Sequence, residues 1–257
     1  MKMTGTQIMV QGLLDHGVDL VFGYPGGTIL PFYDELSRHS DKITHVLTSH
    51  EQGAAHAADG YARASGRIGV CIATSGPGST NLVTGIATAY MDSIPMVVLT
   101  GNVASSVLGT DGFQEVDTTG ITMPITKHNI LVKDLHTLKE SLDLAFKLAK
   151  EGRPGPVLVD VPQDVQLASL EYSPAPVKLS DTGNQADEYQ EQLAKSEKEN
   201  ASLLQEAADM INQARKPMIL IGGGILRSHA CPQLLRFAEQ IQAPVASTLM
   251  GVGAFPY

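Results

Sequence analysis

The chain has 257 residues, a hydrophobic content of 43% and a formal net charge of -9 at pH 7, so it is long and apolar enough to bury a sizeable core. This acidic balance disfavours a nucleic-acid partner, because no basic stripe is present to displace counterions from a phosphate backbone. No apolar run reaches the roughly 20 residues of a membrane span and no leader pattern precedes the first helix, so we expect a cytoplasmic protein that acts on small molecules.

Along the chain, apolar runs alternate with helical patterns. The first helix starts near residue 5, places Met9 and Leu13 on one side, and ends at Gly17. Strand-like and helix-like segments then follow one another at residues 20–24, 44–49, 51–64, 67–74, 79–93, 95–101 and 156–162. This order predicts an α/β fold, a doubly wound parallel sheet with helices on both faces. Cys71 and Cys231 are expected to be reduced, buried thiols.

A further helix is predicted at residues 137–150, where Thr137 and Glu140 form a candidate capping box. Its expected core face consists of Leu138, Leu142, Ala145, Phe146 and Ala149.

The composition changes after residue 170. Residues 171–195 contain prolines and many polar side chains, which predicts a linker. A helix at 201–214, a strand at 217–221, a triple-glycine turn and a second helix from 230 come next. One and a half such repeats cannot close a sheet around a core of their own. We therefore expect a first domain at residues 1–170 and an incomplete second domain at 196–257.

Four loops that follow predicted strands have an unusual composition. They are YPGGT at 24–28, SHEQG at 49–53, TSGPGSTN at 74–81 and TDGFQE at 110–115. In open parallel sheets, ligands bind where such loops lead from strands into helices. Each loop taken alone has a simpler interpretation as a turn. Four together favour a ligand site.

Several chemistries are disfavoured by these loops. The loop at 74–81 lacks the lysine and the spacing of a triphosphate-binding loop. His50 and His56 are six residues apart, about 240° around a helix, so they cannot share one metal-binding face. No G-x-S-x-G elbow is present. What remains is Glu51, a single carboxylate after a strand, whose simpler interpretation is a favourable charge at a helix N-terminus.

Longer segments around these loops carry a specific resemblance. The segments are FGYPGGTILPFYDEL at 22–36, the continuous stretch 49–101 that begins SHEQGAAHAADGYA, GTDGFQEVDTTGITMPITKHN at 109–129, and GRPGPVLVDVPQDVQ at 152–166. In order and spacing they resemble the pyrimidine-binding domain of the acetolactate synthases, which are thiamine-diphosphate-dependent enzymes. The resemblance covers about residues 4–170 and is weaker from residue 200 onward.

The resemblance implies a catalytic subunit that decarboxylates pyruvate and joins the hydroxyethyl group to a second 2-oxo acid, in branched-chain amino-acid biosynthesis. In this family the glutamate matching Glu51 hydrogen-bonds the aminopyrimidine of thiamine diphosphate and starts a proton relay. Phe113 and Gln114 match a pair that faces the reacting centre. The positions that match the family's pyrimidine pocket are Tyr24, Pro25, Gly26, Gly27 and Asn81.

Further cofactors and partners are implied in the same way. The family carries FAD, and Arg153 together with Gly222, Gly223 and Gly224 matches its flavin contacts. Mg²⁺ is held in the family by a C-terminal Gly-Asp-Gly…Asn element, which this sequence does not contain. The resemblance also implies a homodimer or tetramer and a separate regulatory small subunit. Gln163 stands where the family commonly has a lysine, so we do not assign the role of that lysine to Gln163.

Two alternatives stay open at this point. A related thiamine-diphosphate decarboxylase, of the oxalyl-CoA or benzoylformate type, would share the sheet and Glu51, whereas the Phe-Gln pair favours the synthase. Glyoxylate carboligase is disfavoured, because it lacks the glutamate. The other alternative is a non-catalytic fragment, since half of the family's site is absent from this sequence.

Overall fold

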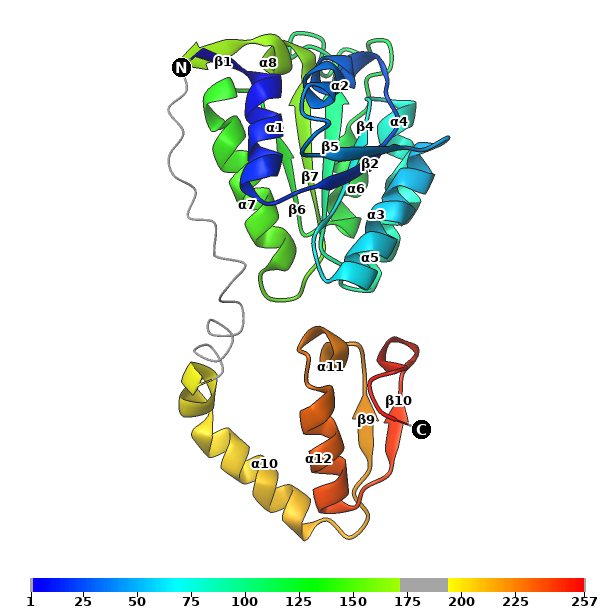
Figure 1. The fold of residues 1–257 in the computed structure, drawn as a ribbon, viewed down its shortest axis with the longest axis vertical. Coiled ribbons are helices and arrows are strands. Elements are labelled where there is room, and N and C mark those ends of the chain that lie inside the picture. The colour runs from blue at the N-terminus through cyan, green and yellow to red at the C-terminus, as the bar shows by residue number, and fades with distance from the viewer. Residues whose placement is uncertain (1, 172–193, 257) are drawn as a thin grey trace. The chain divides into compact units, whose positions relative to one another are not determined.

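The computed structural model describes residues 2–171 and 194–256, and the chain divides into two compact units at residue 177 (Figure 1). Most of the predicted linker at 171–195 lies outside the described residues. No helix among the described residues is long and apolar enough to cross a membrane.

The first unit is built on a six-stranded parallel sheet with the order β3-β2-β4-β5-β7-β6. This confirms the predicted α/β fold. Because parallel neighbours need crossover connections, each strand is followed by a segment that returns over one face of the sheet. The strands are β2 (Leu20–Gly23), β3 (Thr44–Leu47), β4 (Gly69–Ala73), β5 (Met96–Asn102), β6 (His128–Leu131) and β7 (Pro156–Pro162).

Helices cover both faces of this sheet (Figure 1). Successive residues of a strand point to opposite faces, so Val97 and Leu99 enter one core while Met96 and Val98 enter the other. Burying each of these side chains contributes roughly 1.5–3 kcal/mol. The first core is shared with α1 (Gly5–Asp15), α2 (Leu30–Ser37) and α7 (Leu138–Lys150), and the second with α3 (Glu51–Ser65) and α5 (Val83–Met91).

The predicted core face of α7 is confirmed, since all five of its apolar residues are buried. The predicted capping box is wrong. The chain enters α7 through a 3-10 turn, η3 (Leu135–Thr137), and the Thr137 hydroxyl donates to the Asp134 carbonyl at 2.9 Å. Thr137 is thereby already helical, with φ -91° and ψ -6° instead of the extended backbone of an N-cap, and its side chain accepts no capping hydrogen bond.

Three short strands in the described part of the first unit escaped prediction, as did β10 (Val245–Ser247) in the second unit. β6 is a half-exposed edge strand, and edge strands lack the continuous apolar pattern of buried ones. β1 (Lys2–Thr4) pairs antiparallel with β8 (Ser169–Glu171), which joins the beginning and the end of the unit. Short helices α4 (Pro77–Asn81), α6 (Thr118–Thr122) and α8 (Gln163–Leu167) complete the unit.

The second unit has a small core formed by Ile221, Leu234 and Ala254. Its two strands are parallel, and α10 carries no buried residue. Cys71 of the first unit is buried and burial raises its pKa to about 12, whereas Cys231 is half-buried, so the prediction of two buried thiols holds only for Cys71. The elements are α10 (Ala201–Gln213), β9 (Ile219–Ile221), α11 (Gly224–Arg227), α12 (Cys231–Ile241) and β10 (Val245–Ser247).

Candidate functional site

The four unusual loops gather at one edge of the sheet. They follow β2, β3, β4 and β5, which are consecutive neighbours in the order β3-β2-β4-β5. Since all these strands are parallel, their carboxyl ends lie at the same edge. The fold therefore brings together loops that are separated by up to about 90 residues in the sequence.

Glu51 is the first residue of α3, and its side chain is buried. The helix begins with His50 as N-cap, whose ring Nδ1 accepts from the Gln52 backbone N–H at 3.1 Å. A carboxylate in the first turn also interacts favourably with the helix dipole, so position alone fits the simpler interpretation. Two neighbours of the carboxylate distinguish Glu51 from a residue that only stabilises the start of a helix.

One neighbour is Asn81, whose side-chain amide donates to Glu51 Oε2 at 2.9 Å. The other is Gly78, where an added Cβ would lie 3.3 Å from Glu51 Oε1 and 2.6 Å from Thr74 Cγ2. A larger residue at position 78 would therefore press on both side chains. Glycine at this position leaves room for the Glu51 and Thr74 side chains.

The loop at 24–28 is fastened to the loop at 74–81 by a network of hydrogen bonds. Thr28 and Thr74 share a hydroxyl–hydroxyl bond of 2.9 Å, and the Ser75 backbone N–H donates to Thr28 Oγ1 at 3.0 Å. The buried Gln166 amide donates to the Thr28 carbonyl and the Val161 carbonyl, each at 2.8 Å. These bonds fix the backbone of the loop that contains Tyr24 to Gly27.

Sequence reasoning missed Thr28, Thr74 and Gln166. Gln166 gives no signal in the sequence, because other polar residues, Gln163 and Asp164, stand beside it. A single sequence does not reveal that its partner is 138 residues away. Contacts between such distant residues can be recognised only in the folded structure.

The loop after β5 packs on the glycine-rich loop at Gly76. Gly76 has a φ of 60°, and a Cβ there would lie 2.7 Å from the Gln114 carbonyl oxygen. Gln114 itself has a φ of 58°, a conformation that costs a non-glycine residue about 1 kcal/mol or more. Next to it, the Phe113 side chain is 88% exposed. The structure thus places both residues beside the loop of Gly78 and Asn81.

A buried polar cluster that sequence reasoning missed lies at the carboxyl end of β5 and β7. Asp160 accepts from the Thr100 hydroxyl at 2.7 Å and from the Asn102 amide at 2.5 Å. Burial outweighs these two bonds and raises the pKa of Asp160 to about 6. The cluster borders a cavity of about 320 Å³ that Lys133 and Asp117 also line.

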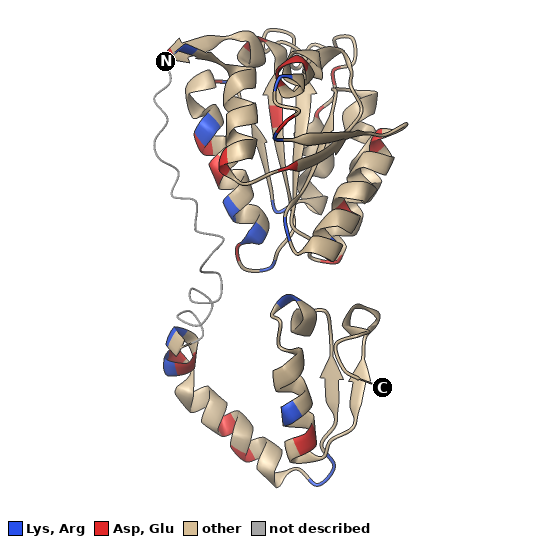
Figure 2. Cartoon of the chain, viewed as in Figure 1, with Lys and Arg blue, Asp and Glu red and all other residues tan. Residues whose placement is uncertain are grey.

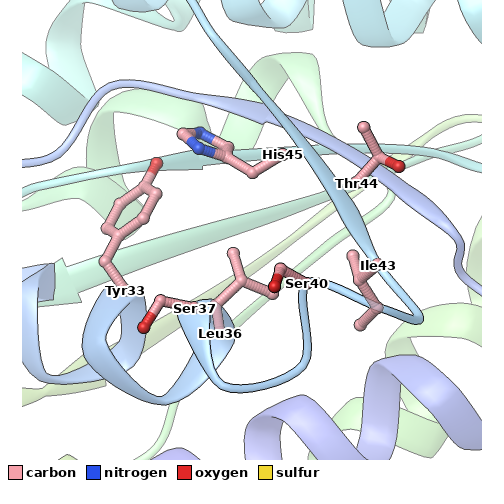
Figure 3. Close-up of a pocket in the computed structure, with 7 residues that line it drawn as sticks. All are labelled: Tyr33, Leu36, Ser37, Ser40, Ile43, Thr44 and His45. Carbon is pink, nitrogen blue, oxygen red and sulfur yellow. The ribbon is translucent and has the colours of Figure 1, made fainter.

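A second cavity, of about 410 Å³, lies between α2 and β3 (Figure 3). Tyr33 and His45 meet there edge to face, with ring centroids 4.9 Å apart. Burial raises the pKa of Tyr33 and lowers that of His45, so both stay neutral near pH 7. None of the predicted site residues lines this cavity.

Arg153 lies away from the convergent loops. It precedes β7, at the amino end of the sheet, and its guanidinium donates to the Ser93 hydroxyl at 2.7 Å and to the Met91 carbonyl at 3.2 Å. Gly222, Gly223 and Gly224 belong to the second unit, where the last of them begins α11. Within residues 2–171 and 194–256, no three or more His, Cys, Asp or Glu side chains are grouped as metal ligands.

Two family models match the sequence. Residues 3–121 match the thiamine pyrophosphate enzyme, N-terminal TPP binding domain, and residues 204–257 match the thiamine pyrophosphate enzyme, central domain. The first match covers all four convergent loops.

Full-length relatives show the same likeness. The chain is 48% identical over 257 residues to an acetolactate synthase of Arthrospira platensis, with 99% of this chain and 43% of that protein covered. It is 49% identical over 255 residues to the acetolactate synthase large subunit of Corynebacterium glutamicum, covering 99% of this chain and 39% of the relative. A probable acetolactate synthase large subunit of Methanocaldococcus jannaschii is 47% identical over 256 residues, at 99% and 42% coverage. The chain thus spans about two fifths of the length of these curated relatives.

Proposed function

Because the chain belongs to the thiamine pyrophosphate enzymes, we propose that it forms the pyrimidine-binding part of an acetolactate synthase. The observation that carries the proposal is the buried carboxylate of Glu51, which has one oxygen held by Asn81 and the other beside Gly78. The proposed reaction decarboxylates pyruvate and joins the two-carbon unit to pyruvate or 2-oxobutyrate. Relatives named as acetolactate synthases favour this reaction over that of a simple decarboxylase.

The residues present suit an aminopyrimidine ring. The loops at 24–28 and 74–81 contain no charged side chain, so a neutral ring would meet no bare charge from either of them. When bound, thiamine diphosphate supplies an electron sink for decarboxylation of a 2-oxo acid. Glu51 would hold a proton at the ring nitrogen, and Tyr24, Pro25, Gly26 and Gly27 would form the wall opposite. Gln114 would donate to substrate oxygen without adding a charge.

Further parts of the proposal rest on the resemblance to the family. They are an FAD held with help from Arg153 and the glycines at 222–224, Mg²⁺ bound through a C-terminal domain, a dimer or tetramer of catalytic subunits, and a regulatory small subunit. A cytoplasmic location and the absence of nucleic-acid partners belong to the same proposal. Figure 2 shows Lys and Arg interspersed with Asp and Glu in both units, which fits a protein without a basic binding face.

Product analysis of the holoenzyme that carries this chain tests the proposed reaction. With pyruvate as sole substrate, together with thiamine diphosphate, Mg²⁺ and FAD, we expect carbon dioxide and the five-carbon acetolactate in a ratio of about one to one. Acetaldehyde as the main product would show a decarboxylase instead, and the proposal would then be wrong.

Gln114→Ala tests the residue proposed to face the substrate. We expect turnover to fall about tenfold or more, with the dissociation constant of thiamine diphosphate changed by less than about threefold, because the amide acts on substrate oxygen and not on the cofactor. Steady-state kinetics and cofactor titration measure the two quantities. Asp111→Asn is the matched control, since it changes an exposed residue of the same loop that also has a positive φ. Equal losses in turnover and cofactor affinity would place Gln114 against the cofactor.

A further inference from the structure

Asn81 and Glu51 come from different segments but meet inside the site. Asn81 ends the short helix α4, and Glu51 starts α3. The Asn81 amide donates to Glu51 Oε2 at 2.9 Å. The opposite orientation of the amide would set its oxygen against a carboxylate oxygen, so the donating orientation is the one that the pair requires.

This bond makes the two carboxylate oxygens different from each other. Oε2 accepts from the NH2 group of the Asn81 amide, which can only donate. Oε1 has no hydrogen bond among the described residues and lies beside Gly78, where only a hydrogen atom stands in place of a side chain. A proton that Glu51 exchanges with another group is therefore best held by Oε1.

We propose that Asn81 is a positioning residue, which holds the Glu51 carboxylate so that Oε1 faces the aminopyrimidine. This inference rests on the proposed function, and it changes the role of Asn81 from a cofactor contact to a partner of the catalytic carboxylate. Asn81 acts through Glu51. Without this bond the carboxylate could rotate, and Oε1 would be aligned with the ring for only part of the time.

Two variants separate positioning from packing. Asn81→Ala removes the donor and the volume, whereas Asn81→Asp keeps the shape but replaces the donor by an oxygen that repels Glu51. In the holoenzyme we expect turnover to fall about 10- to 100-fold in both variants, as for loss of a hydrogen bond to a charged group. We expect the dissociation constant for thiamine diphosphate, measured by calorimetric titration of the apoenzyme, to change less than about threefold.

A double-mutant cycle with Glu51→Ala, which removes both carboxylate oxygens, gives the second measurement. If Asn81 acts through Glu51, Asn81→Ala should change turnover by less than about twofold in the Glu51→Ala background. An equal fall in both backgrounds would overturn the proposal, as would wild-type turnover in Asn81→Asp or a loss of cofactor affinity that matches the loss of turnover.

If the proposed function itself is wrong, the measurements differ from those expected when only the role of Asn81 is wrong. If Glu51→Gln by itself leaves turnover unchanged, the role of Glu51 is wrong and the positioning role falls with it. If Glu51→Gln is impaired while both Asn81 variants turn over at the wild-type rate, only the role of Asn81 is overturned.

Discussion

Replacing Glu51 by Gln in the holoenzyme should lower turnover by about two orders of magnitude or more, with the fold retained. Glutamine has nearly the same size, and its side-chain oxygen can still accept from the Asn81 amide. It cannot take up or release a proton near neutral pH. The loss should therefore appear in proton transfer, and exchange of the cofactor's thiazolium C2 proton for deuterium, followed by NMR after rapid quenching, measures that step directly.

Glu35 offers a matched control for this substitution. It is a second buried carboxylate in the first unit, on α2, where it pairs with Arg38 and His39. We expect Glu35→Gln to change turnover less than about threefold, because no described site residue contacts it. If Glu51→Gln exchanges the C2 proton at nearly the wild-type rate, the catalytic assignment of Glu51 is wrong.

Residues 1–257 on their own should be inactive and bind thiamine diphosphate weakly, even with Mg²⁺ present. A diphosphate needs cationic partners, and Mg²⁺ usually binds through one or two carboxylates together with phosphate oxygens. The loops at 24–28 and 74–81 contain no Lys or Arg, and the described residues form no metal-ligand group. The pyrimidine contacts alone would leave most of the cofactor's charge without a partner.

Calorimetric titration of this chain with thiamine diphosphate and Mg²⁺ measures the prediction. Far-UV circular dichroism on the same sample serves as the control, since it checks that the α/β unit is folded. A micromolar dissociation constant would contradict the prediction, because it would require a complete cofactor site within these residues.

Complete burial explains why three of the strands were predicted from the sequence. β4, β5 and β7 are buried along their whole length, so their residues form continuous apolar runs bounded by turns. The five apolar residues of α7 were predicted for a similar reason, since their 3.6-residue spacing indicates one buried face. Glu51 was chosen as a candidate site residue because it follows a predicted strand, and ligands bind at the carboxyl ends of parallel strands.

What escaped prediction depends on contacts between distant segments. The bond between Gln166 and the Thr28 carbonyl, and the Asp160 cluster with Thr100 and Asn102, each join residues more than 50 positions apart. No periodicity marks such pairs, because each member looks like an ordinary polar residue in the sequence. The capping box at Thr137 failed at short range, because the 3-10 turn holds Thr137 in a helical conformation and not in the extended one that an N-cap requires.

The antiparallel pair of β1 and β8 brings residues 2–4 and 169–171 of the first unit together. Lys2 lies opposite Glu171 and Thr4 opposite Ser169, so the chain enters and leaves this unit at one place. A domain with adjoining ends can be inserted into another chain, or rejoined in a new order, without opening its sheet. Recombination could therefore move this unit as a cassette between multidomain proteins, and the four convergent loops within residues 24–115 would move with it.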